Sequence, residues 1–100
     1  MPAYLVANIT VRDPERFKAY AAGAPELIAR HGGRYIVRGG ASVVLEGNPG
    51  VNRTVIVEFP SLQHAQDLYA DPAYQALVAI RQQASETHMF CIEGFGGAAA

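Results

Sequence analysis

The sequence predicts one α+β domain in which a four-stranded antiparallel sheet carries helices on one face only. The periodicity of its apolar residues gives the order strand, helix, strand, strand, helix, strand. The first predicted strand has one wholly apolar face and one mixed face, which is typical of a sheet covered on one side. A chain of 100 residues, half of them apolar, suits a single modest core. We therefore expect one domain over residues 1–95, followed by a flexible tail of small residues at 96–100.

The first half of the chain predicts a strand and a long helix. Residues 4–11 alternate as a strand, with Leu5, Ala7, Ile9 and Val11 on the apolar face. Asp13-Pro14 predicts a helix start, because Asp accepts hydrogen bonds from free first-turn amides and Pro needs no N–H partner there. Apolar residues at helical spacing extend this helix to Gly32-Gly33, and Pro25 is expected to bend it.

The second half predicts a hairpin, an interrupted helix and a last strand. Residues 34–46 and 53–59 form the arms of the hairpin, and Gly39-Gly40 predicts a bulge or sharp bend in the first arm. Ser61 predicts the N-cap of the next helix, and Asp71-Pro72 restarts that helix at its middle. Residues 87–93 are expected to form the last strand.

This element order is the ferredoxin-like split βαβ pattern, with both helices on one face of the sheet. The other face would present Tyr4, Val6, Ile36 and Ile56, an apolar patch larger than soluble monomers normally tolerate. A second copy covers such a face most simply, because a two-fold interface needs only one self-complementary surface. We therefore expect a homodimer that forms through the open sheet face.

Three segments of the chain resemble the uncharacterised family known as domain of unknown function 1330 (DUF1330). They are residues 33–40 (GRYIVRGG), 57–61 (VEFPS) and 69–77 (YADPAYQAL), together with Arg81 and Glu93-Gly94. The resemblance spans residues 4–94 and implies the dimeric α+β-barrel superfamily, in which two ferredoxin-like units pack sheet against sheet. That superfamily includes cofactor-free quinone-forming monooxygenases, haem-degrading enzymes, lactone isomerases and proteins with no established activity, so the resemblance supports a fold rather than a reaction.

Composition argues against several classes of function. A net charge of -1, with eight Lys and Arg residues and no basic cluster, gives no footprint for nucleic acid or anionic membranes. The N-terminus lacks a leader pattern and no apolar run is long enough to span a membrane, so we expect a cytoplasmic protein. The lone Cys91 excludes an intrachain disulfide, and His31, His64 and His88 lack the spacing of metal ligands. We expect no metal and no cofactor.

The first candidate site lies on the open face of the sheet. Asn8, Arg38 and Glu58 share one parity along their strands if the hairpin keeps its register, and Arg38 could then face Glu58 inside the barrel. In the functional interpretation Asn8 orients a ligand, Arg38 holds an anionic or carbonyl oxygen, and Glu58 is the candidate catalytic base. In the alternative, Arg38 and Glu58 are a structural ion pair and Asn8 bonds across the dimer interface.

The second candidate site consists of Tyr69, Tyr74 and Arg81. Arg81 lies on the apolar side of its helix, where it could close a cleft between helix and sheet. The alternative is that Arg81 extends its charged head to the rim and that the tyrosines only pack in or beside the core. Cys91 is interpreted as a buried small apolar residue, and Arg53 as half of an exposed pair with Glu46 beside the hairpin loop.

Two function hypotheses follow. One is a homodimeric barrel that binds a small polar or aromatic molecule between sheet and helices, with a cofactor-independent oxidoreductase or isomerase reaction. The other is a non-catalytic binding or assembly module whose interior polar residues only fix dimer register. The chain has no Trp, unlike several superfamily monooxygenases, and this argues against oxygenase chemistry.

Overall fold

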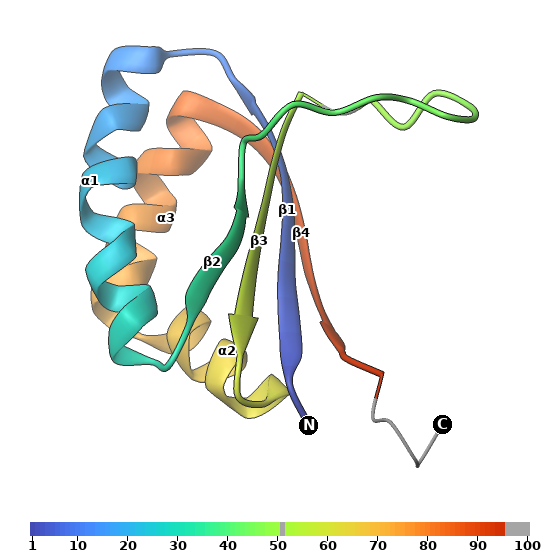
Figure 1. The fold of residues 1–100 in the computed structure, drawn as a ribbon. Helices are drawn as coiled ribbons and strands as arrows, with labels where there is room; N and C mark the ends of the chain where they lie inside the picture. The colour runs from blue at the N-terminus through green and yellow to red at the C-terminus, as the bar shows by residue number, and fades with distance from the viewer. Residues whose placement is uncertain (51, 96–100) are drawn as a thin grey trace.

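The computed structural model describes residues 1–50 and 52–95. Its strands and helices follow one another as β1 (Ala3–Val11), α1 (Pro14–Arg30), β2 (Arg34–Arg38), β3 (Arg53–Phe59), α2 (Leu62–Ala70), α3 (Pro72–Ala84) and β4 (Ser85–Glu93). All three helices lie on one side of the sheet (Figure 1). The predicted α+β, ferredoxin-like order is confirmed, and the second predicted helix is divided into α2 and α3.

The sheet has four antiparallel strands in the order β2-β3-β1-β4. β1 is central, since its Leu5 pairs with Val57 on β3 and with Cys91 on β4. β2 and β4 are therefore the two edge strands. As an edge strand, β4 has a neighbouring strand on one side only, whereas β1 has one on each side.

The core lies between the helices and the apolar face of β1. Ala3, Leu5, Ala7 and Ile9 are all buried there, as their alternation predicts. The helices and β3 supply the rest of this layer, which includes Tyr20, Ala24, Leu27, Ile28, Val57, Phe59, Leu68, Tyr74 and Val78. Full burial of one such aliphatic side chain contributes about 1.5–3 kcal/mol, so this layer is the main source of stability.

The predicted helix starts are confirmed by their capping bonds. The side chains of Asp13, Ser61 and Asp71 each accept a hydrogen bond from a first-turn N–H, at 3.1, 3.2 and 2.9 Å, in α1, α2 and α3 respectively. Asp71 also meets the far end of α1, because its Oδ2 lies 2.9 Å from His31 Nε2. This bond lowers the pKa of Asp71. The α1 terminus is thereby tied to the α2–α3 junction.

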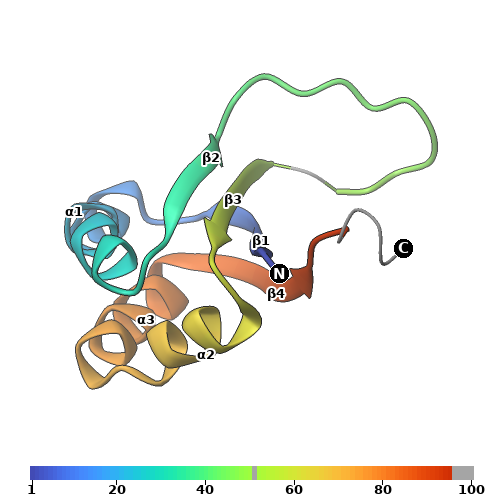
Figure 2. The same ribbon diagram turned by 60° about the horizontal axis from the view of Figure 1, so that its bottom comes forward.

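The first arm of the hairpin is shorter than predicted. β2 ends at Arg38, and residues 39–50 follow as an irregular loop that extends away from the sheet (Figure 2). The cause is Gly39, whose φ of 70° lies in the left-handed region and ends the extended conformation. The last strand is longer than predicted, because β4 begins at Ser85 rather than at residue 87. The predicted tail at 96–100 lies outside the described residues.

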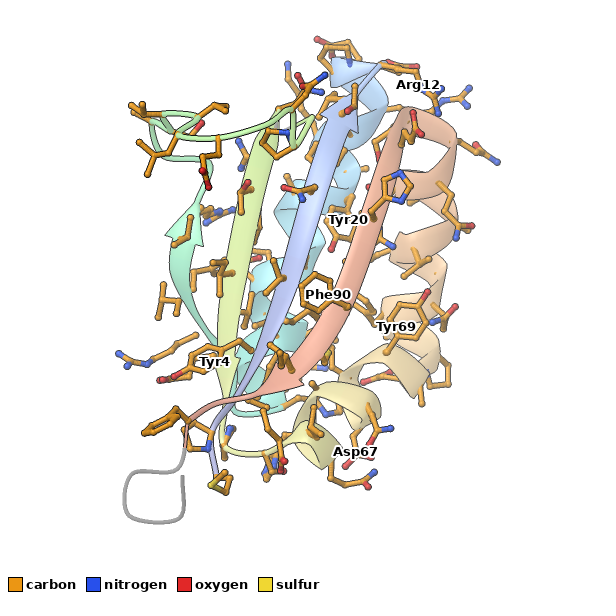
Figure 3. All side chains as sticks on the ribbon, turned by 90° about the vertical axis from the view of Figure 1, so that its right-hand side faces the viewer. Tyr4, Arg12, Tyr20, Asp67, Tyr69 and Phe90 are labelled. Atoms are coloured by element: carbon orange, nitrogen blue, oxygen red, sulfur yellow. The ribbon has the colours of Figure 1, made fainter. Side chains whose placement is uncertain are left out.

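The second face of the sheet has no helix over it. Figure 3 looks onto this open face, with Tyr4 and Phe90 in front of the strands. Phe90 is 56% exposed, and Ile36 and Ile92 on the same face are also exposed. Within residues 1–50 and 52–95, no helix is long and apolar enough to cross a membrane.

Candidate functional site

The main cavity lies between α2, α3 and the edge strand β4, and is named here the β4 cavity. Its volume is about 600 Å³, within the usual range for small-molecule sites. Its lining includes Leu5, Tyr69, Gln75, Arg81, Thr87, Met89 and Cys91. The strand pairing explains it, because the β4 residues opposite the buried Leu5, Ala7 and Ile9 are only half-buried or exposed. The helices cover β1 and leave this face of β4 partly open.

Arg81 enters this cavity from α3 and is only 3% exposed. Its Nη1 donates hydrogen bonds to Tyr74 Oη at 3.2 Å and to Tyr20 Oη at 3.3 Å. The two phenol oxygens are 2.6 Å apart, and the guanidinium carbon lies 5.1 Å from the centre of the Tyr20 ring. Arg81, Tyr20 and Tyr74 therefore form one buried polar cluster at the back of the cavity.

The Arg81 charge has no carboxylate partner in the part of the chain that the structure describes. Its Nε is buried and makes no hydrogen bond to any described residue. Burial lowers the pKa of Arg81, but the oxygens of Tyr20 and Tyr74 raise it by more, so the guanidinium stays charged. Burial, with the Tyr20 phenol second, raises the pKa of Tyr74, which is therefore a neutral phenol at physiological pH. The cluster thus carries one uncompensated positive charge.

The structure brings the second candidate group together. Tyr69 is 43% exposed and lines the cavity, and its ring packs against that of the buried Tyr74 at a centroid distance of 6.2 Å. The alternative that Arg81 extends its head to the rim is wrong, because the guanidinium is held inside by the two phenols. Tyr74 does belong to the core, as its alternative interpretation holds.

The structure does not bring Arg38 to Glu58. Glu58 accepts hydrogen bonds from Arg34 Nε at 2.7 Å and from Tyr4 Oη at 3.3 Å on the open face. The strand pairing is the first reason, because Arg34 lies opposite Glu58 and Arg38 is four residues further along β2. A β-bulge is the second, because the register between β2 and β3 shifts at Ile36, which is an extra residue opposite Ile56. One inserted residue moves every following side chain to the other face, so Arg38 pairs with Val55 and lies on the helix side.

Asn8 stays on the open face and is satisfied within the chain. Its Oδ1 accepts a hydrogen bond from Thr54 Oγ1 at 2.9 Å, across the β1–β3 pair. Asn8 and Glu58 thus share one face, and the sheet separates both from the β4 cavity.

The structure corrects the predictions made for Cys91 and Arg53. Cys91 is exposed and lines the β4 cavity, because it lies on an edge strand that the helices do not cover. Partial burial raises the pKa of its thiol, which is therefore a neutral group at physiological pH. Arg53 makes no ion pair with Glu46 within the described residues and faces α1. The sequence did indicate this orientation, because alternation along the strand puts Arg53 on the same face as the buried Val57 and Phe59.

Comparisons with known proteins place the chain in a family. The family model described as "Domain of unknown function (DUF1330)" matches residues 2–95. No curated protein matches the sequence. Among solved structures, a protein of unknown function from Rhodopseudomonas palustris is similar with a TM-score of 0.76 and 20% identity, over 95% of this chain and 83% of that one.

Two further solved structures have the same fold. One is SnoaB, a cofactor-independent oxygenase from Streptomyces nogalater, with a TM-score of 0.67 and 14% identity over 99% of this chain and 98% of that one. The other is a dimeric protein of unknown function from Bacteroides fragilis, with a TM-score of 0.52 and 19% identity over 93% of this chain and 96% of that one. These likenesses show the ferredoxin-like fold, and the match over residues 2–95 shows that the chain belongs to the DUF1330 family.

Proposed function

We propose that this protein binds a small, partly aromatic or apolar molecule in the β4 cavity, with a polar or anionic group of that molecule against Arg81. The observation that carries the proposal is a buried guanidinium at the back of a cavity of about 600 Å³, with no carboxylate partner among residues 1–50 and 52–95. A buried charge is costly unless it is paired, and a ligand oxyanion would supply the missing partner.

The composition of the lining supports this choice of ligand. Among the described residues of the lining, Arg81 alone is charged at neutral pH, and the others have neutral polar or apolar side chains. Tyr69 and Met89 offer surface for an apolar or aromatic body, while the amides of Gln66 and Gln82 offer further hydrogen bonds. A small aromatic acid, or a quinol or enol that can ionise, fits both features.

The chemistry available in this cavity is limited to stabilising an anion. Glu58, the candidate base, lies on the other face of the sheet and cannot reach a ligand there. Burial raises the pKa of the Cys91 thiol, which is therefore protonated at neutral pH and unable to accept a proton from a ligand. Arg81 could hold the anion of an acidic enol or phenol that releases its proton to solvent, which is the first step of a cofactor-independent oxidation or isomerisation. The fold likeness to a cofactor-independent oxygenase supports that version of the proposal.

Binding without turnover is the second candidate function. It is favoured by the lack of an acid or base poised to act near neutral pH among the lining residues. The two candidates differ in one measurable respect. Only the first predicts that, with no cofactor added, a bound quinol is oxidised to the quinone by dissolved dioxygen, which is reduced to hydrogen peroxide, or that a bound lactone is isomerised.

The test is ligand binding by wild type and two variants, with a panel of quinols, lactones and small aromatic acids. Cys91→Phe should fill the cavity from the sheet side while leaving Arg81 in place, and Arg81→Met should remove the charge while leaving the cavity open. Both should abolish binding that wild type shows by calorimetry. Arg16→Met, which removes an exposed charge on α1, is the control and should bind normally. No binding by wild type, or normal binding by both cavity variants, would contradict the proposal.

We also infer that a second copy of the chain covers the open face. The exposed Phe90, Ile92 and Ile36 form an apolar surface without a covering helix, and a two-fold pairing would bury the same patch on both copies. The dimeric state of the similar protein from Bacteroides fragilis supports this inference. The polar pairs Asn8–Thr54 and Arg34–Glu58 would then lie within or beside the interface and help fix its register.

A further inference from the structure

A second, smaller cavity lies between α1 and the β2–β3 hairpin, and two arginines line it. Its volume is about 40 Å³, and its lining includes Phe17, Tyr35, Arg38, Arg53 and Val55. It is distinct from the β4 cavity, with which it shares only Leu5 and Met89. Arg38 and Arg53 are named here the arginine pair.

Local backbone features turn the arginine pair toward α1. The bulge at Ile36 moves Arg38 from the open face to the helix side, as bulges commonly do when they re-aim a side chain. Gly39 then leaves room for Arg53, since a Cβ at this glycine would lie 2.8 Å from Arg53 Nη1. The Gly39 N–H donates to Thr54 O at 2.8 Å, which holds this turn against β3.

The arginine pair has no counter-charge among residues 1–50 and 52–95. Neither side chain forms an ion pair with a described carboxylate, and Arg53 Nε is buried without a hydrogen-bond partner. Arg38 stacks over the Tyr35 ring, with its guanidinium carbon 4.6 Å from the ring centre. Burial raises the pKa of Tyr35, and the charges of Arg38 and Arg53 both oppose that rise. Both charges therefore act on the Tyr35 hydroxyl.

We propose that Arg38 and Arg53 form a second ligand site, which binds a carboxylate group at the mouth of the cavity between α1 and the hairpin. Two neighbouring guanidinium groups repel each other, and an oxyanion between them would reverse the sign of that interaction. A planar carboxylate matches the planar donor edge of a guanidinium.

The size of the cavity limits what enters it. A volume of about 40 Å³ holds roughly three water molecules, so a carboxylate with one attached carbon fits and a tetrahedral phosphate fits poorly. The site therefore takes either a very small carboxylic acid or the carboxylate end of a molecule whose remainder stays outside. It does not depend on any ligand in the β4 cavity.

The experiment is an NMR titration of the arginine Nε–H resonances with sodium acetate, at an ionic strength held constant with sodium chloride. The Arg53 resonance, assigned by its loss in Arg53→Met, should shift and saturate in wild type. Arg38→Met should weaken that response about tenfold or more, since one charge-assisted contact is lost. Arg12→Met removes an exposed charge at the β1–α1 connection and should titrate like wild type.

Because the readout is the Arg53 resonance itself, an anion bound at Arg81 does not imitate the result. The exposed Arg38 can be replaced without threatening the core. If Arg53→Met does not fold, the milder change Arg53→Lys also removes the Arg53 Nε–H resonance and supplies the assignment. A linear, non-saturating shift, an equal shift with chloride alone, or wild-type affinity in Arg38→Met would overturn the proposal. Tighter binding of inorganic phosphate than of acetate would overturn the assignment to carboxylates.

Discussion

Polar and charged residues are paired on the open face of the sheet, whereas the described cations that line the two cavities on its helix-covered side have no carboxylate partner. On the open face Glu58 is bonded to Arg34 and Tyr4, and Asn8 is bonded to Thr54. On the helix-covered face Arg81 and the arginine pair have no carboxylate partner in the described part of the chain. Polar groups that are already paired need no ligand, and they can fix the register of an interface. Unpaired cations beside a cavity lack a counter-charge, which a bound anion can supply.

The largest expected effect comes from placing an unpaired charge on the open face. Ile56→Asp should separate the proposed dimer and lower the free energy of unfolding by about 3–5 kcal/mol, because in that dimer its carboxylate would be buried without a partner. Sedimentation and thermal melts measure both effects. Ala19→Asp adds the same charge to an exposed position on α1 and should change neither. A wild-type protein that sediments as a folded monomer would remove the basis for the interface.

The buried cluster on the other face allows a matched pair of tyrosine changes. Tyr74→Phe removes a hydroxyl that bonds to Tyr20 and Arg81, and should lower the free energy of unfolding by about 1–2 kcal/mol. Tyr69→Phe removes a half-exposed hydroxyl with no hydrogen bond to any described residue, and should have almost no effect on stability. Equal losses in the two variants, measured by urea unfolding, would show that the hydrogen bonds of the Tyr74 hydroxyl do not stabilise the fold.

Replacing Arg81 itself separates binding from stability. Arg81→Met removes an uncompensated buried charge and leaves the two phenols bonded to each other, so the free energy of unfolding should rise by about 1 kcal/mol. Ligand binding in the β4 cavity should be lost in the same variant. Chemical denaturation and calorimetry on one preparation measure both quantities. A loss of stability above about 2 kcal/mol would instead make Arg81 a structural residue.

Most of the fold could be predicted from local signals. Asp13, Ser61 and Asp71 mark the helix starts because capping is a local interaction, and the alternation in β1 identifies its buried face. The family followed from three short segments and is confirmed over residues 2–95. Tyr20 could also have been added to the second candidate group, since it lies three residues after Phe17 on the apolar side of α1.

The first candidate site could not be predicted, because its geometry depends on how the hairpin strands are paired and on one inserted residue. Ile36 lies in an uninterrupted run of strand-forming residues, and nothing in the run marks where the bulge occurs. The Gly39-Gly40 signal indicated an irregularity in this arm, but the register shift comes earlier. The prediction that Cys91 is buried is wrong for a different reason. Alternation predicts which face a residue occupies, but not whether a helix covers that face at the sheet edge.

The smallest expected effect tests which residue of β2 lies opposite Glu58. In a double-mutant cycle, Arg34→Met with Glu58→Gln should show a coupling of about 0.5–1 kcal/mol, as expected for a well-formed but largely exposed pair. The matched cycle of Arg38→Met with Glu58→Gln should show no coupling, because the bulge places Arg38 on the opposite face. Urea unfolding at two salt concentrations measures both cycles, and the Arg34 coupling should shrink as salt rises. Coupling between Arg38 and Glu58 in place of Arg34 would mean that β2 is displaced by four residues along β3, and the assignment of Arg38 to the arginine pair would fail with it.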